Sequence, residues 1–317
     1  RLIDRDLAGA LRQPAVLAAV DAVLRGEGDR VVAFDFGVPA ERHLGARLAP
    51  LLPHAATGAV VVLMLHDLTA LKRSDRLRAD FAANASHELR TPLATLVGFI
   101  ETLRGPARED KAAGDRFLAI MAEQAARMTR LVDDLLSLSR IEMNEHRPPT
   151  EALALAPVIE TVARALEQRA AARGIRLVLD LPADLPPVIG DAEELSQLFQ
   201  NLIDNAIKYG AAHSTVEISA GSSTKPLPGP RAGQRAPAVA VAVRDHGDGI
   251  AREHLSRLTE RFYRVDPARS RELGGTGLGL AVVKHIVSRH RGALDIESEL
   301  DEGSVFTIHL PVAPPLS

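Results

Sequence analysis

Residues 86–103, SHELRTPLATLVGFIETL, place a histidine beside a glutamate and a proline five residues after the histidine. In a helix, His87 and Thr91 lie one above the other, each about 200° around from the leucine between them. Both therefore face away from the apolar stripe of this segment. Pro92 offers no amide to the carbonyl of Glu88, so we expect a bend just past the histidine and a freed carbonyl beside this face.

These residue types can carry nucleophilic and proton-transfer chemistry. A neutral imidazole attacks through one ring nitrogen while the other holds the proton, and a neighbouring carboxylate fixes that tautomer and stabilises the developing positive charge. Taken alone, however, an isolated exposed histidine is more often a solvated surface residue. The assignment of His87 therefore depends on the rest of the chain.

A second constellation is NLIDNAIKYG at 201–210. Asn201, Asn205, Lys208 and Tyr209 follow at spacings of 4, 3 and 1, so one helix face presents two amides, an ammonium and a phenol. A neutral amide oxygen suits a magnesium ion already compensated by phosphates, and a lysine would counter phosphate charge. A polar outer helix face is the alternative for this segment alone.

Two glycine-rich stretches downstream favour the binding interpretation. In RDHGDGI, Asp245 at a strand end can accept a hydrogen bond from an adenine amino group, while Gly247 and Gly249 permit a turn close to a ligand. GGTGLGLAVVKHI opens a helix, and its glycines expose amides that can cradle phosphates. Three such elements in this order indicate a nucleotide site more strongly than one would. The cradle glycines are Gly275, Gly277 and Gly279.

The elements that must position these residues predict a multidomain α+β chain. Residues 1–67 form a small, truncated α+β unit with a helix at 14–26 and strands at 30–36, 42–52 and 59–67. Residues 149–313 mix helices and strands. The expected helices are 154–174, 191–210 and 279–291, and the expected strands are 175–181, 214–220, 238–245, 293–299 and 304–310.

Between these units, two heptad stripes predict two long helices in an antiparallel hairpin. Asp67 or Thr69 supplies the cap at the start of the first helix, which ends near residue 103. Two helices cannot bury both stripes, whereas two hairpins paired as a four-helix bundle can, so we expect a homodimer. The stripes are Leu89, Leu93, Leu96, Ile100 and Leu103, and Phe117, Met121, Met128, Leu131, Leu135 and Leu138.

Composition restricts the partners. The 317 residues, 46% hydrophobic and 25% charged, suit two or three folded domains, and a formal net charge of -3 argues against a nucleic-acid binder. Zero cysteine excludes thiol catalysis and fits a reducing compartment. The apolar run 58–67 is too short to cross a bilayer. We expect a cytoplasmic fragment of a longer protein that is anchored upstream in the inner membrane.

SHELRTPLATLVGF closely resembles the phosphoacceptor sequence of sensor histidine kinases, because its His, Glu, Arg, Thr and Pro fall at that family's spacings. NLIDNAIKYG, DHGDGI, RFYRVD and GGTGLGLA resemble the N, G1, F and G2 boxes of the family's ATP-binding domain, shared in outline with gyrase and the Hsp90 chaperones. The resemblance covers about 75–313. HDLTALKRSDRLRADF is similar to the segment that leads from a PAS sensor domain into a signalling helix. Among these kinases, the sequence is most similar to the phosphate-regulon sensor kinases.

This resemblance implies a partial PAS-like sensor domain at 1–67, a dimerisation and histidine phosphotransfer domain at 68–148, and an α/β-sandwich ATP-binding domain at 149–313. It implies that ATP phosphorylates His87, that Glu88 polarises the imidazole, and that the phosphoryl group passes to an aspartate of a response-regulator receiver domain. Thr91 would position water when the phosphorylated regulator is hydrolysed.

The same resemblance assigns the nucleotide contacts. Asn205 would bind Mg²⁺ with Asn201 beside it, and Asp245 would read adenine. Lys208, Tyr209 and Arg264 would face the phosphates, and residues 264–276 would form a mobile lid over ATP.

Two other functions and one loop remain open at this stage. A nucleotide-regulated dimerisation scaffold would require a damaged site, yet His87, Glu88, Asn205 and Asp245 are all present. ATPases of the gyrase and chaperone type place a carboxylate base where this chain has Asn201, and an amide cannot act as that base. The stretch 221–238 is rich in Pro and Gly and predicts an extended hairpin loop, longer than the family leads us to expect, or a tolerated surface insertion.

Overall fold

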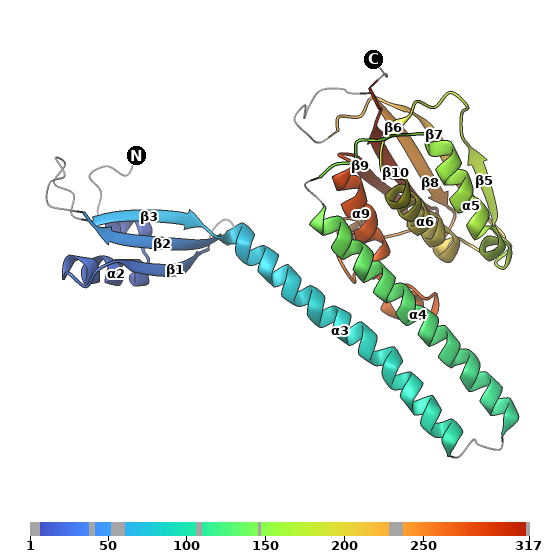
Figure 1. Ribbon diagram of the computed structural model, residues 1–317, viewed down its shortest axis with the longest axis horizontal. Coiled ribbons are helices and arrows are strands. Elements are labelled where there is room, and N and C mark those ends of the chain that lie inside the picture. Colours follow the sequence, from blue (N-terminus) through green and yellow to red (C-terminus); the bar gives the residue numbers. More distant parts are fainter. Residues whose placement is uncertain are drawn as a thin grey trace. The chain divides into compact units, whose positions relative to one another are not determined.

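The computed structural model describes residues 7–37, 42–51, 61–105, 110–144, 147–227 and 237–314. The chain divides into two compact units, Arg1–His87 and Glu88–Ser317. Helix α3 (Thr69–Arg104) runs across the boundary between them (Figure 1). The predicted fold class, a multidomain α+β chain, is confirmed. The finer domain boundaries after residues 67 and 148 stay a prediction.

The first unit packs one helix on a small sheet. Alternating apolar residues place one face of each strand against α2 (Pro14–Leu24), and the sheet is antiparallel in the order β1-β2-β3. Its strands are β1 (Arg30–Phe36), β2 (Arg42–Pro50) and β3 (Val61–Asp67), and α1 (Leu7–Leu11) precedes them. The core consists of Val16, Ala19, Val23, Phe34, Ala46 and Leu48.

The second unit begins with the predicted helical hairpin. The part of α3 after His87 contacts α4 (Lys111–Met143), where the rings of Phe99 and Phe117 stack with centroids 5.0 Å apart. The carboxylate of Asp110 accepts a hydrogen bond from the Ala113 amide at 2.9 Å and caps α4. Helix α3 continues through Pro92. Among the described helices, none is long and apolar enough to cross a membrane.

The hairpin buries only part of the predicted stripes. Leu89, Leu96 and Leu103 on α3 are partly buried, whereas Leu93 and Ile100 are 51% and 43% exposed. On α4, a second set of apolar side chains lies beside the buried stripe and is also exposed. One chain therefore leaves apolar side chains uncovered on both helices, here called the uncovered apolar face: Leu93, Val97 and Ile100 on α3, and Leu118, Val132 and Leu136 on α4.

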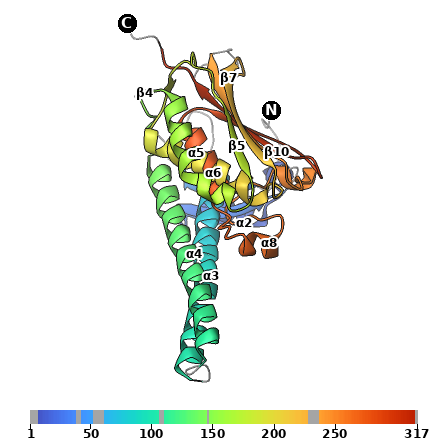
Figure 2. The same cartoon turned by 90° about the vertical axis from the view of Figure 1, so that its right-hand side faces the viewer.

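A five-stranded sheet in the order β5-β7-β8-β10-β9 forms the rest of the second unit. Strands β5 and β7 are parallel and the other pairs are antiparallel. Helices α5, α6 and α9 cover one face (Figures 1 and 2). The bounds are α5 (Leu155–Ala171), β5 (Arg176–Asp180), α6 (Ala192–Tyr209), β7 (Thr215–Ser223), β8 (Ala238–Asp245), α9 (Gly279–Arg289), β9 (Ala293–Glu299) and β10 (Gly303–Pro311).

Among the described residues of the second unit, four short elements were not predicted, because two to six residues carry too little periodicity to identify. They are β4 (Ala152–Leu153), β6 (Val188–Ile189), α7 (Arg252–Leu255) and α8 (Pro267–Glu272). Strands β7 and β8 flank the predicted 221–238 loop as expected. Residues 228–236 of that loop lie outside the described part of the chain.

Helix α6 is anchored at both ends. Asp191 caps its start by accepting hydrogen bonds from the amides of Glu193 and Glu194 at 3.0 and 3.1 Å. The Asp191 amide in turn donates to Nε2 of His290 at 3.0 Å, so Nδ1 carries the proton and donates to the Ile286 carbonyl. Burial lowers the pKa of His290, which favours this neutral form.

The last turn of α6 is held by Arg173, which lies just after the end of α5. The guanidinium of Arg173 donates to the carbonyls of Ile207 and Lys208, and reaches that of Gly210 at 3.4 Å. A cation at this end satisfies orphan carbonyls and opposes the negative end of the helix dipole. Arg173 therefore fixes the turn that carries the last polar residues of α6.

Candidate functional site

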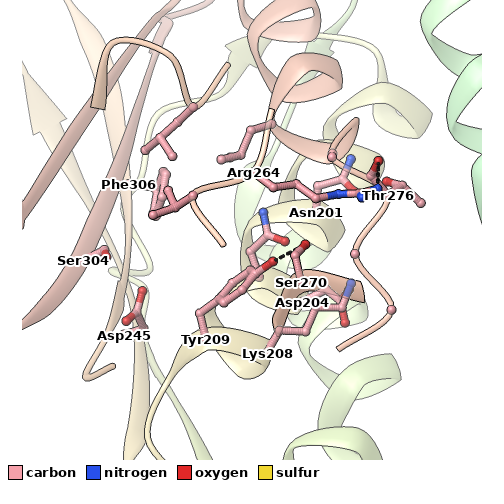
Figure 3. A pocket seen from close by; sticks show the side chains of 18 of the residues that line it. Asn201, Asp204, Lys208, Tyr209, Asp245, Arg264, Ser270, Thr276, Ser304 and Phe306 are labelled. Atoms are coloured by element: carbon pink, nitrogen blue, oxygen red, sulfur yellow. Dashed lines mark hydrogen bonds and ion pairs between the residues drawn. The ribbon is translucent and has the colours of Figure 1, made fainter. Parts of the chain in front are cut away.

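A cavity of about 480 Å³ lies on the polar side of α6. Its wall includes parts of α4, α5, α6, β8 and β10, together with residues 248–250 and the chain from 263 to 280. Figure 3 shows Asp245 and Ser304 on one side of it, with Arg264 and Thr276 on the other. The cavity brings together most of the predicted binding residues: Asn201, Asn205, Lys208, Tyr209, Asp245, Gly249, Arg264, Gly275, Gly277 and Gly279.

The amides of α6 project into this cavity because the opposite face of the helix is apolar and buried. The buried set contains Leu195, Leu198, Phe199, Leu202, Ile203, Ala206 and Ile207. Nδ2 of Asn201 is buried and has no hydrogen-bond partner among the described residues. Leaving such an atom unpaired costs about 1–3 kcal/mol, and its position at the wall of a cavity suits it to donate a hydrogen bond to a molecule bound there.

Asp245 lies at the base of the cavity and is only 4% exposed. Burial raises the pKa of its carboxyl, and hydrogen bonds from the amides of Gly247 and Ser304 oppose that rise. The Gly247 amide lies 3.0 Å from Oδ1 of Asp245. A carboxylate has about four acceptor sites, so beside these two amides it can accept a further hydrogen bond from a polar group on a ligand.

Two glycines show why side chains are excluded around the cavity. Gly247 does not line it, but a Cβ there would lie 2.1 Å from the Tyr209 carbonyl oxygen. Gly277 has a φ of +74°, and a Cβ there would lie 2.9 Å from Cα of Phe262. Only glycine allows these backbones to approach so closely. The glycine stretch before α9 thus presents bare backbone to the cavity.

Several charged residues of the wall were not predicted. Asp204 binds Lys208 at 2.8 Å and Arg169 at 2.5 Å. The Asp204–Lys208 pair has helical i,i+4 spacing, so the α6 sequence itself carried a signal for it. Thr276 lies within a stretch that was recognised for its glycines alone. The α4 residues Arg130, Asp133 and Asp134 also line the cavity, although nothing in their local sequence distinguishes them.

The predicted phosphoacceptor residues lie elsewhere on the chain. His87 and Thr91 are exposed on α3 and do not line the cavity. The carboxylate of Glu88 contacts the guanidinium of Arg264 at 2.9 and 3.3 Å and that of Arg127 at 3.3 Å. Arg264 also donates to the Thr276 carbonyl at 2.8 Å. The residue after His87 is thus connected to the glycine stretch through one arginine.

The donor set fits a magnesium–nucleotide complex. It offers neutral amide oxygens, cations, exposed backbone amides and one buried carboxylate, whereas no cluster of three or more His, Cys, Asp or Glu residues that could hold a metal ion is found among the described residues. A metal bound mainly by phosphates and one or two protein oxygens needs no such cluster. Apolar groups such as Ile250, Leu258 and Phe306 line the same cavity and suit a planar base.

Comparison with known proteins agrees with this arrangement. Residues 190–314 match the family of histidine kinase-, DNA gyrase B- and HSP90-like ATPases, and residues 77–144 match the His Kinase A (phospho-acceptor) domain. An ATPase domain of this type, which binds ATP, preceded by a phosphoacceptor hairpin defines the class. The chain belongs to the sensor histidine kinases of two-component systems.

Individual relatives support the same family. The chain is 36% identical over 252 residues to the phosphate regulon sensor protein PhoR of Pseudomonas aeruginosa, covering 80% of this chain and 54% of the relative. It is 34% identical to the sensor protein kinase WalK of Staphylococcus aureus, covering 80% and 58%. The Acinetobacter baumannii histidine kinase AdeS superimposes with a TM-score of 0.55 at 29% identity, covering 72% of this chain and 98% of that one. The chain spans about half the length of the curated relatives it matches.

Proposed function

We propose that this chain uses ATP to phosphorylate His87. A ring nitrogen of His87 attacks the γ-phosphorus, a P–N bond forms, the bond to the β-phosphate oxygen breaks, and ADP leaves. The proposal rests on the cavity, where the amide face of α6, Asp245 and the glycine stretch come together. The same chain contains the His Kinase A (phospho-acceptor) domain. Such phosphoryl transfer needs mainly positioning and charge neutralisation.

In this account each wall of the cavity holds one part of ATP. Asp245 accepts from the adenine amino group, while Lys208 and Tyr209 face the phosphates with the amides of Gly275, Gly277 and Gly279. The side-chain oxygen of Asn205 would bind Mg²⁺, with Asn201 beside it, and Gly249 leaves room near the base. The ion, when bound, supplies charge neutralisation to the phosphates.

The side chains of Glu88 and Arg264 form an ion pair in the structure, and the proposed reaction requires each of them to contact a different group. The proposal assigns Glu88 to the His87 imidazole and Arg264 to the phosphates, whereas the structure pairs their side chains. Separation of this pair would free the carboxylate to stabilise the imidazole's positive charge and the guanidinium to bind phosphate at the same time. Arg264 is only 7% exposed, so an incoming anion, and not water, is its natural replacement partner.

His87→Gln should abolish labelling by γ-labelled ATP because the substituted amide cannot become a phosphoramidate. ATP affinity should stay nearly unchanged, since His87 does not line the cavity. The label on the parent chain should be acid-labile and base-stable. His66→Gln, which changes another exposed histidine, is the matched control and should label normally. Persistent label on His87→Gln would contradict the assignment.

We further propose that the phosphoryl group passes to an aspartate of a response-regulator receiver domain. The two-component family supports this partner class, and the similarity to PhoR supports, as a finer proposal, a regulator that responds to phosphate supply. A transfer assay with purified receiver domains tests it. A phosphate-regulon receiver should be phosphorylated faster than receivers of other systems, and equal rates would contradict the finer proposal.

Thr91→Ala should keep autophosphorylation and transfer but lose most phosphatase activity toward the regulator. The Thr91 hydroxyl lies one turn beyond His87 and can hold a water without being a strong base, and only hydrolysis needs that water. Rates of all three reactions are the measurement. Thr102→Ala removes a similar hydroxyl farther along α3 and should change none of them. A parallel fall of autophosphorylation and phosphatase activity would contradict a water-positioning role.

We also propose that the chain forms a homodimer through the uncovered apolar face of the hairpin. Burying each such Leu, Val or Ile contributes roughly 1.5–3 kcal/mol, which favours pairing of two hairpins. Val97→Glu should therefore shift the chain toward monomer in sedimentation equilibrium. Ala126→Glu, an exposed α4 position away from this face, should leave the dimer intact. A parent chain that sediments as a monomer at micromolar concentration would contradict the proposal.

A further inference from the structure

One stretch of α4 reaches the nucleotide cavity, although α4 belongs to the phosphoacceptor hairpin. Arg130, Asp133 and Asp134 line the cavity. The hydroxyl of Thr276, within the glycine stretch, donates to Oδ2 of Asp134 at 2.6 Å. This hydrogen bond holds α4 against the backbone that would cradle the phosphates. It also places the residue one turn earlier, Arg130, at the same backbone.

The guanidinium of Arg130 lies directly against Gly274. A Cβ at Gly274 would lie 2.9 Å from Nη2 of Arg130, and the φ of Gly274 is +69°. The close approach therefore depends on the absence of a side chain at this position. Arg264 contacts the same loop from another direction, through the Thr276 carbonyl. Two arginines thus border residues 274–277, one from the ATPase domain and one from the hairpin.

The two arginines differ in how their charge is used. Other cations of the wall already contact carboxylates: Lys208 and Arg169 contact Asp204, Arg264 contacts Glu88, and Arg269 contacts Asp248. Among the side chains that the structure describes, which do not include those of Arg271 and Glu272, no carboxylate forms an ion pair with Arg130. Its positive charge is available to an anion in the cavity.

Neither of the neighbouring α4 carboxylates, Asp133 and Asp134, forms an ion pair with Arg130. Burial raises the pKa of Asp134, and the hydrogen bond from Thr276 opposes that rise. Its Oδ2 is already occupied by the Thr276 hydroxyl. Asp133 and Arg130 are both exposed to solvent, where water screens the attraction between them. An incoming polyphosphate would therefore meet Arg130 as the attractive group of α4.

We propose that Arg130 binds the terminal phosphates of the nucleotide, so that the hairpin contributes a ligand to the ATP site. A guanidinium can hold phosphate oxygens with two parallel hydrogen bonds, which a lysine cannot reproduce. This inference rests on the proposed function, because it assumes that ATP occupies the cavity. The contact would couple the hairpin to nucleotides according to their number of phosphates, most strongly for a triphosphate.

The test compares Arg130→Gln, Arg130→Lys and the matched control Arg116→Gln, an exposed arginine nearer the start of α4 that does not line the cavity. Each full chain is titrated with a non-hydrolysable ATP analogue, with ADP and with adenosine, in the presence of Mg²⁺. Arg130→Gln should weaken the ATP analogue by roughly 10-fold, ADP less, and adenosine not at all. Arg130→Lys should fall between, and Arg116→Gln should match the parent.

Unchanged adenosine affinity shows that the cavity of Arg130→Gln is intact, so loss of the fold cannot imitate the expected result. Equal weakening of all three ligands, or unchanged affinity for the ATP analogue, would overturn the role of Arg130 while leaving the proposed function standing. A parent chain that binds none of the three ligands would overturn the proposed function and this inference together.

Discussion

The two-sided packing of α6 is the constraint on which the nucleotide site depends. Its buried face includes Phe199, Leu202 and Ile203, each at most 1% exposed, and it packs toward α5, α9 and the sheet. Burial of each large apolar side chain contributes roughly 1.5–3 kcal/mol, so a rotation of the helix would lose several such contributions at once. The side chains of Asn201, Asn205 and Lys208 on the opposite face consequently point into the cavity.

Charge pairing around the cavity follows from the same geometry. A triphosphate site needs several cations close together, and without a ligand those cations would repel one another. The structure shows Asp204 between Lys208 and Arg169, and Glu88 on Arg264. These carboxylates neutralise the cations, and in the proposed function phosphates would replace them as partners. Because Glu88 adjoins His87, the proposed exchange at Arg264 would connect the acceptor segment physically to the state of the nucleotide site.

Local sequence predicted most elements, since helical and strand periodicities extend over many residues in this chain. The α6 polar face and the two glycine stretches were also readable, because their residues are neighbours in sequence or lie one turn apart. The stripe on α3 was read as one seam, whereas Leu93 and Ile100 lie outside the intrachain contact. Helical periodicity gives the direction of a side chain around the helix axis, but it does not say which other element packs against that side chain. Contacts such as Asp134–Thr276, separated by 142 positions, follow only from the assembled fold.

In the proposed function, the neutral amide face of α6 holds magnesium–ATP for transfer to His87. The most direct measurement is the Mg²⁺ dependence of autophosphorylation in Asn205→Asp, compared with Gln168→Glu, an equivalent amide-to-acid change at an exposed site on α5. A negative ligand disturbs metal geometry and repels phosphate, so we predict that Asn205→Asp loses roughly 100-fold or more in rate, about 2.7 kcal/mol. Gln168→Glu should match the parent. Labelling of Asn205→Asp at the parental rate and Mg²⁺ requirement would contradict the account.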